Sequence, residues 1–182
     1  MELANPPYNP APQGTISGTV ETEDGLQIRY GLWKSSSYPV KGTVLLLHGR
    51  AEYVEKLYET VGDIRANGFD VLSFDWRGQG GSSRLLKDPR RGYVDDFDHY
   101  LFDLDAIMKE VALPECKAPF YILAHSTGAL VALLAAPDFS NRIRRMVLSA
   151  PLLGLGRTPT SQSTARLMSG FLCSVGLGQV YM

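Results

Sequence analysis

A single serine, Ser126, lies between small residues in the stretch Leu123-Ala124-His125-Ser126-Thr127-Gly128. Residues 119–123 before it form a short apolar run that favours a strand, and residues 129–136 are apolar throughout, as in a buried helix. A serine at a sharp strand-to-helix turn is held in a strained conformation with its hydroxyl exposed, and small neighbours let the strand and helix pack closely. The stretch therefore matches the G-x-S-x-G nucleophile motif in a relaxed form, with Ala124 at the first glycine position.

Ser126 has an alternative role as an ordinary helix cap that does no chemistry. Acyl transfer needs in addition a base, a group that orients the base, and amide donors aimed at the developing oxyanion. The amides of Thr127 and Arg50 could supply these donors, because Thr127 follows the serine and Arg50 lies in the loop after His48-Gly49. Gly49 would allow the backbone to turn inward, although His48-Gly49 could also simply end a strand.

The composition narrows the class of protein. With 182 residues, 45% hydrophobic and 20% charged, and a net charge of -1, the chain is typical of one soluble domain that does not attract nucleic acid. Cys116 and Cys173 are far apart, so neither a disulfide framework nor a metal site is expected, and no pattern indicates a cofactor. No signal peptide or transmembrane segment is evident, and a cytoplasmic location is therefore expected.

The order of patterns along the chain predicts the fold class. Four prolines in residues 1–14 predict an extended N-terminal arm. Residues 15–20 and 26–34 alternate in polarity around a turn and predict an antiparallel hairpin. Four buried strands are predicted further on, at residues 44–47, 69–74, 120–124 and 143–148. Because helical patterns separate these strands, we expect an α/β fold with a mostly parallel sheet and right-handed crossovers.

Three helical patterns lie between the strands. One has an apolar stripe formed by Val54, Leu57, Val61 and Ile64. A second has an apolar stripe running from Phe97 to Val111, and its other face is predicted to be a solvated face rather than a metal site; that face carries Asp98, Asp103, Asp105, Lys109 and Glu110. The third follows Ser126, is predicted to be buried on most sides, and is expected to end at Pro137.

Three loops follow predicted strands, at residues 48–52, at residues 75–82 and at Ser126. The carboxyl ends of parallel strands share one edge of a sheet, so these loops should converge on one site. In this order they resemble the α/β-hydrolase superfamily, in its branch of bacterial lysophospholipases, monoacylglycerol lipases and serine aminopeptidase-like (S33) proteins. The motifs that carry the resemblance are Leu46-Leu47-His48-Gly49, Phe74-Asp75-Trp76-Arg77-Gly78-Gln79-Gly80-Gly81-Ser82, Gly92-Tyr93-Val94-Asp95, Leu123-Ala124-His125-Ser126-Thr127-Gly128 and Leu148-Ser149-Ala150-Pro151.

The resemblance runs from about Gly14 to the end and implies a set of site residues. Ser126 would be the nucleophile, and the backbone amides of Arg50 and Thr127 would form the oxyanion hole. Other residues would shape the site: His48, Gly49, Ala124, His125, Gly128, Asp75 and Arg77. Asp75 is an attractive triad acid, but this fold runs Ser, then acid, then His, so Asp75 and Arg77 are expected to hold their loop through hydrogen bonds.

The later triad members are missing from this sequence. Its three histidines are His48, His99 and His125, none of which follows Ser126, and no Asp or Glu follows Asp138. His125 is badly placed as the base, because neighbouring side chains on a strand point to opposite faces. No triad acid or triad histidine is therefore assigned.

The resemblance also divides the chain. Residues 1–14 would be the arm, residues 15–151 the N-terminal part of the hydrolase core, and residues 152–182 the start of a lid with a helix over residues 162–171. We expect the chain to be part of a longer hydrolase rather than a complete specialised protein, and its sheet to keep an unpaired parallel edge.

The expected function is that of a serine hydrolase of carboxylic esters, acting on lysophospholipids or monoacylglycerols, with these 182 residues nearly inactive alone. Two alternatives stay open: a non-catalytic binding module with the same fold, and a serine peptidase. The sequence leaves acyl length, peripheral membrane contact and oligomeric state undecided.

Overall fold

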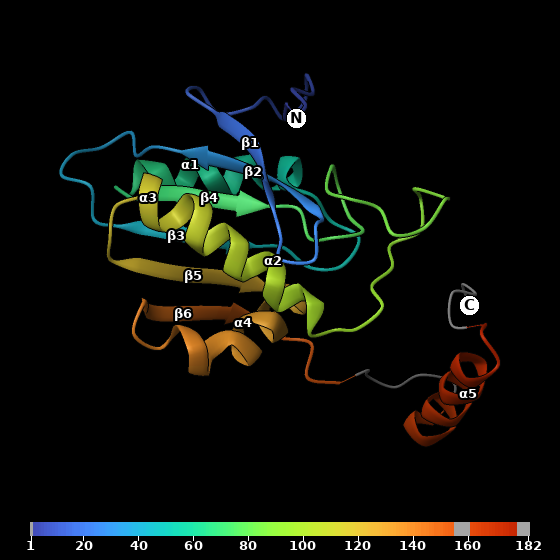
Figure 1. The fold of residues 1–182 in the computed structure, drawn as a ribbon. Coiled ribbons are helices and arrows are strands. Elements are labelled where there is room, and N and C mark those ends of the chain that lie inside the picture. Colours follow the sequence, from blue (N-terminus) through green and yellow to red (C-terminus); the bar gives the residue numbers. More distant parts are fainter. Residues whose placement is uncertain (1, 155–160, 178–182) are drawn as a thin grey trace. The chain divides into compact units, whose positions relative to one another are not determined.

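A computed structural model describes residues 2–154 and 161–177. The chain divides into two compact units, Met1–Pro151 and Leu152–Met182. The first unit holds a six-stranded sheet and the helices that cover it (Figure 1). In the second unit, residues 155–160 and 178–182 lie outside the described residues, and one helix is described.

The sheet has the strand order β1-β2-β4-β3-β5-β6. Its strands are β1 (Ile16–Glu21), β2 (Gln27–Trp33), β3 (Thr43–Leu47), β4 (Asp70–Phe74), β5 (Phe120–His125) and β6 (Ile143–Ser149). The pairs β1–β2 and β2–β4 are antiparallel, while β3 pairs in parallel with β4 and β5, and β5 with β6. The predicted hairpin and the predicted α/β class with a mostly parallel sheet are both confirmed.

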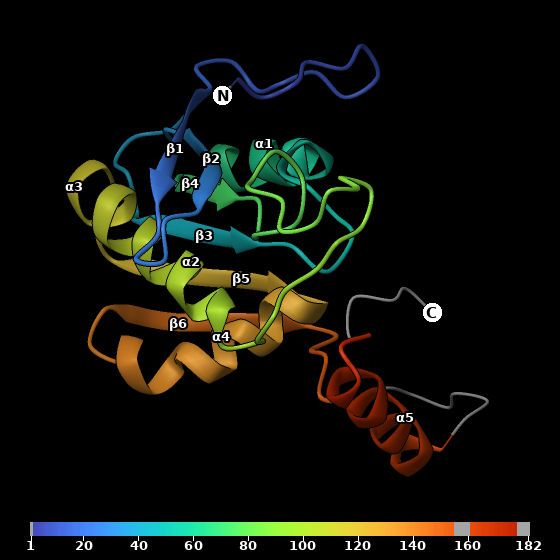
Figure 2. The same ribbon diagram turned by 45° about the vertical axis from the view of Figure 1, so that its right-hand side comes forward.

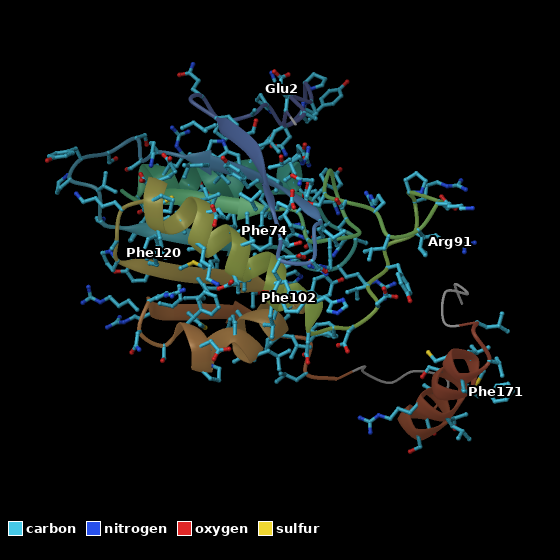
Figure 3. The ribbon with its side chains drawn as sticks, viewed as in Figure 1. Glu2, Phe74, Arg91, Phe102, Phe120 and Phe171 are labelled. Carbon is cyan, nitrogen blue, oxygen red and sulfur yellow. The ribbon has the colours of Figure 1, made fainter. Side chains whose placement is uncertain are left out.

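Helices cover both faces of the sheet (Figures 1 and 2). The first unit contains the 3-10 helix η1 (Val54–Leu57), α1 (Tyr58–Ala66), α2 (His99–Ile107), the π-helical turn η2 (Met108–Ala112), α3 (Leu113–Glu115) and α4 (Ser126–Phe139). Successive strand residues point to opposite faces, and this alternation divides the core into two clusters. Leu45 and Leu72 pack with α2 and α4, whereas Leu46 and Val71 pack with η1 and α1. Figure 3 shows the side chains of the first cluster, with Phe74 of β4 among them.

The end of α4 differs from the prediction. The helix continues through Pro137 to Phe139, because a proline near the last turn removes only one late backbone hydrogen bond. The helix is also less buried than expected, since Leu133 and Leu134 are exposed.

β6 is a strand, as predicted, but it is not buried. Among the described residues it pairs only with β5, so Arg144, Arg145 and Val147 are exposed along it. The described part of the sheet therefore has the unpaired parallel edge that the sequence predicted.

The arm, residues 2–14 of the described chain, contains no helix or strand. The Ala4 amide donates to Glu55 Oε1 at 2.9 Å, and the Tyr58 hydroxyl donates to the Ala4 carbonyl at 2.7 Å. Leu3 and Ala11 pack against the cluster under η1 and α1. The arm is thus held against the rest of the first unit by both polar and apolar contacts.

Asp103 overturns part of the solvated face predicted for the second helix. Its carboxylate is fully buried and accepts hydrogen bonds from the Arg77 amide at 2.9 Å and from Arg77 Nε at 2.8 Å. Arg77, also fully buried, reaches Asp24 with its other nitrogens, and this hydrogen bond lowers the pKa of Asp24 to about 2. The signal was present in the sequence, since Asp103 lies three residues after Tyr100 and four before Ile107 on the apolar side of the helix.

The second unit contains α5 (Gln162–Ser174), three residues longer at its end than predicted. Ser161 caps the helix by accepting a hydrogen bond from the Thr164 amide. Leu167 and Phe171 are exposed on it. Across the described residues, α5 included, we find no helix with the length and apolar character needed to span a membrane.

Asp103→Asn tests the buried ion pair. The substitution leaves Arg77 charged and buried with one partner fewer, so the free energy of unfolding should fall by about 3–5 kcal/mol in urea unfolding. Asp105→Asn is the matched control, because Asp105 lies on the same helix but, among the described residues, pairs only with the exposed Lys109. That variant should change stability by less than about 0.5 kcal/mol, and equal effects of the two variants would contradict the assignment.

Candidate active site

Ser126 lies at the junction of β5 and α4, with its side chain half-buried. His125 has an extended backbone, whereas Ser126 has a φ of 51°, in the left-handed region that residues other than glycine rarely adopt. The strained turn expected of a nucleophile is therefore present. Ala124 is buried and lies opposite Leu47 of β3 in the parallel register, so β3 ends beside this turn.

Gly128 is required by the packing of this turn. A Cβ atom at that position would lie 2.5 Å from the His48 carbonyl oxygen and 2.8 Å from that of Leu47. Both are backbone atoms of the segment that leaves β3, and they cannot move away without shifting the strand. The close approach of α4 to β3 thus explains why a glycine stands here.

The loop after β3, residues 48–53, passes directly beside the serine and is called the β3 loop below. A Cβ atom at Gly49 would lie 3.0 Å from Ser126 Cβ. The reason predicted for Gly49 needs correction, because the left-handed residue of the loop is Ala51, with a φ of 58°. Gly49 is needed for its close approach to the serine instead.

Two of three consecutive amides in the β3 loop are already bonded. The Gly49 amide donates to Glu52 Oε2 at 2.8 Å, and the Ala51 amide donates to Gln79 Oε1 at 2.6 Å. The Arg50 amide between them makes no hydrogen bond within the described residues, while its side chain is exposed. Among the amides of residues 49–51, that of Arg50 is therefore the free donor. Glu52 and Gln79 were not identified from the sequence, since the loop has no periodic pattern that marks their partners.

The first turn of α4 carries Thr127, whose amide stands next to the serine. Its side chain is buried, and Thr127 Oγ1 has no hydrogen-bond partner among the described residues. His125 is exposed, and no hydrogen bond joins the Ser126 hydroxyl to a histidine ring in the described part of the chain. The structure thus brings together Ser126, Thr127, Arg50, Gly49 and Gly128, without a base.

Asp75 fixes the end of the β3 loop through a hydrogen bond to the Val54 amide. This fully buried carboxylate accepts hydrogen bonds from the Val54 amide at 2.9 Å, the Gly81 amide at 2.8 Å and Arg29 Nε at 2.7 Å. Burial opposes ionisation of Asp75, but the neighbouring His48 ring, the Arg29 charge and the Gly81 amide outweigh it and hold the pKa of Asp75 below its usual range. Asp75 therefore fixes its neighbours by hydrogen bonds, and none of the hydrogen bonds found among the described residues joins it to Ser126.

Arg29 and Glu55 extend this buried charge group. Arg29 Nη1 and Nη2 donate to the two carboxylate oxygens of Glu55, each at 2.8 Å. The sequence did not reveal the pair, because a charged residue on a strand or at a helix start is usually solvated. Only the strand order brings β2 and η1 to the same side of Asp75.

His48 faces Asp75 rather than the serine. Its Nδ1 lies 2.8 Å from the Gly49 carbonyl oxygen, and its Nε2 lies 3.7 Å from Asp75 Oδ1. Trp76 Nε1 donates to the His48 carbonyl at 2.9 Å.

Arg77 lies in the loop at residues 75–82 and does not face the serine either. Its hydrogen bonds to Asp103 and Asp24 fix the start of this loop. No group of His, Cys, Asp and Glu suited to a metal ion occurs among the described residues.

A mostly parallel sheet with helices on both faces, and a strained serine where β5 meets α4, define an α/β hydrolase. Residues 38–178 match the model of the family described as serine aminopeptidase, S33, and the chain belongs to that family.

Named relatives agree with this family. The chain is 37% identical over 116 residues to a probable lysophospholipase L2 of Haemophilus influenzae. The matched stretch covers 64% of this chain and 36% of that protein. It is 34% identical over 132 residues to lysophospholipase L2 of Escherichia coli, covering 72% of this chain and 38% of that one. A soluble variant of monoglyceride lipase from Saccharomyces cerevisiae, in complex with a substrate analog, has the same fold, with a TM-score of 0.66 and 24% identity over 92% of this chain and 55% of that chain. The matched region thus spans about 36% to 55% of the length of each of these relatives.

Gly128→Ala tests the close packing of β3 and α4. The added methyl group would meet two backbone carbonyls, so we expect a loss of about 1–3 kcal/mol in the free energy of unfolding. Gly62→Ala in α1 is the matched control, since no atom lies within 4 Å of its Cβ position. That variant should be stabilised by up to about 1 kcal/mol, because alanine favours a helix. Wild-type stability of the Gly128→Ala variant would refute the packing argument.

Proposed function

We propose that Ser126 is the nucleophile of a carboxylic ester hydrolase and that the amides of Arg50 and Thr127 are its oxyanion hole. The observation that carries the proposal is the strained Ser126 beside a loop in which the Arg50 amide alone, of three successive amides, has no acceptor among the described residues. Preorganised donors of this kind stabilise charge that develops on the carbonyl oxygen in the transition state.

The proposed reaction begins with attack of the Ser126 hydroxyl oxygen on the ester carbonyl carbon. The carbonyl oxygen becomes an oxyanion held by the two amides, the alcohol leaves with a proton, and water then hydrolyses the acyl-enzyme. A base must take the serine proton in the first step. We propose that a histidine and an acid outside these 182 residues do this, so the chain alone should keep only the rate enhancement of an incomplete triad, about 10³ to 10⁴ over water.

Lysophospholipids and monoacylglycerols are the proposed substrates. The support comes from the relatives, which are named lysophospholipases and monoglyceride lipases. Residues 152–182 are proposed to begin the lid, and the exposed Leu167 and Phe171 of α5 would suit an acyl chain. Amide bonds are the second candidate substrate class, because the family description names an aminopeptidase.

Labelling by a fluorophosphonate tests the nucleophile in the chain as it is. We expect slow labelling that added imidazole accelerates, since imidazole can replace the absent base, and no labelling of Ser126→Ala. Ser140→Ala is the control, because Ser140 is an exposed serine that follows the same helix. Equal labelling of wild type and Ser126→Ala would contradict the hydrolase proposal and favour a non-catalytic binding module.

Arg50→Pro tests the oxyanion donor itself. Proline removes the amide hydrogen, so imidazole-assisted labelling should slow by about 10² to 10³, the usual cost of losing one oxyanion donor. Arg50→Ala keeps the amide and loses only the exposed side chain, so its labelling rate should stay within about twofold of wild type. If both variants lose the same amount, the guanidinium rather than the amide would be the important group. Urea unfolding of each variant checks that the fold is retained.

A further inference from the structure

Gln79 is a buried side chain that joins two loops of the candidate active site. It belongs to the loop at residues 75–82, and its Oε1 atom accepts a hydrogen bond from the Ala51 amide of the β3 loop at 2.6 Å. Only 5% of the residue is exposed to solvent. Its Nε2 atom is buried and has no hydrogen-bond partner among the described residues. The oxygen is therefore the atom through which this side chain acts on its surroundings.

The backbone of Gln79 is itself held in place. Its amide donates to the Trp76 carbonyl at 3.0 Å, and its carbonyl accepts from the Ser82 amide at 3.1 Å. The next residue, Gly80, has a φ of 47°, and a Cβ atom there would collide with the Asp75 carboxylate. The loop thus packs tightly on a buried side chain. Gln79 therefore presents its Oε1 atom to the β3 loop from a base that is ordered before a substrate binds.

The peptide unit between Gly49 and Arg50 carries the free amide, and the amides on both sides of it are tied by side chains. The Gly49 amide donates to Glu52 Oε2 at 2.8 Å, and the Ala51 amide donates to Gln79. Peptide units are planar, so fixing the two neighbouring units restricts the direction in which the Arg50 N–H points. Two acceptor side chains thus control one donor without contacting it.

Ala51 shows that this arrangement is held at a cost to the backbone. Its φ of 58° lies in the left-handed region, which is unfavourable for a residue with a Cβ atom. Such a residue persists only where its surroundings hold it, and strain of this kind is concentrated at functional sites. The hydrogen bond to Gln79 is the contact that holds the Ala51 amide. The strained residue and its buried partner therefore belong to one device next to Arg50.

We infer that Gln79 and Glu52 are positioning residues of the oxyanion hole, which bind the amides on either side of Arg50 and so fix the direction of the Arg50 amide. The inference rests on the proposed function, because it assigns what holds the oxyanion donor of that site. Both side chains act through the backbone and are not catalytic residues. A displacement of about 1 Å in a catalytic group can cost about 10²-fold in rate, so the hold on this amide matters.

Gln79→Met removes the acceptor and keeps the length of the side chain. Imidazole-assisted labelling of Ser126 by the fluorophosphonate should slow by about 10- to 10²-fold, because the Arg50 amide is no longer held in direction. Gln79→Glu keeps an oxygen that can accept from the Ala51 amide, so its rate should be closer to that of the wild type than to that of Gln79→Met. Equal rates of the wild type and Gln79→Met would overturn the inference.

Gln27→Met is the matched control, because Gln27 is an exposed glutamine of β2 whose side chain, among the described residues, donates only to Glu21. Its labelling rate should stay within about twofold of the wild type. Urea unfolding of each variant checks that the fold is retained. A control that slows as much as Gln79→Met would show that the loss has nothing to do with the β3 loop.

Combining Arg50→Pro with Gln79→Met separates positioning from a general loss of structure. Arg50→Pro already lacks the amide hydrogen, so adding Gln79→Met should change its labelling rate by less than about twofold. A merely structural role of Gln79 would slow labelling by the same factor with and without the Arg50 amide. That result would contradict the assignment of Gln79 as a positioning residue.

Amide hydrogen exchange followed by NMR tests the contact without any labelling. In the wild type the Ala51 amide should exchange at least about ten times more slowly than the Arg50 amide, relative to an unfolded chain, and Gln79→Met should remove this protection. Equal protection of the two amides in the wild type would overturn the inference. If Gln79→Met does not fold, Glu52→Ala applies the labelling test from the other side of Arg50, with Glu52→Gln as the variant that keeps an acceptor.

The outcomes separate this inference from the proposed function. A wild-type chain in which Ser126 stays unlabelled would refute the proposed function, and the exchange measurement would still decide whether Gln79 holds the Ala51 amide. A labelled Ser126 whose rate is unchanged in Gln79→Met would refute this inference alone.

Discussion

One buried carboxylate joins the loops on which the site depends. Asp75 follows β4 and accepts hydrogen bonds from the Val54 amide at the end of the β3 loop and from the Gly81 amide of its own loop. Arg29 binds it from β2, and Glu55 balances Arg29. A carboxylate without solvent needs such partners to stay ionised, so the same contacts that stabilise Asp75 also fix the position of the β3 loop.

Close backbone packing supplies the second constraint. Gly49 lets the β3 loop approach Ser126, and Gly128 lets α4 approach the end of β3, more closely than a side chain would allow. The serine accepts a strained φ, and the surrounding packing holds it there. The site is therefore built by parallel strands that end together, and the proposed oxyanion donors are backbone amides, which need no particular side chain at position 50.

The sequence predicted the parts of the fold that depend on local periodicity. The apolar runs at β3 and β4 are buried on both faces, and the strands predicted as a hairpin pair antiparallel, so both features were predicted correctly. Asp103 was misplaced on the solvated face although its spacing from Tyr100 puts it on the apolar side. The Arg29–Glu55 pair could not be predicted, because strand order, rather than spacing along the chain, brings the two residues together. The left-handed Ala51 likewise has no sequence signal, since alanine rarely adopts that conformation.

The central claim is that Ser126 and the Arg50 and Thr127 amides act on one carbonyl group. A crystal structure of the chain after reaction with a fluorophosphonate tests this most directly, because the phosphoryl oxygen of the adduct occupies the place of the oxyanion. The account predicts a covalent bond to Ser126 Oγ, with that oxygen at hydrogen-bond distance, about 2.7–3.1 Å, from both amide nitrogens. An adduct on another residue, or a phosphoryl oxygen that points away from both amides, would contradict it.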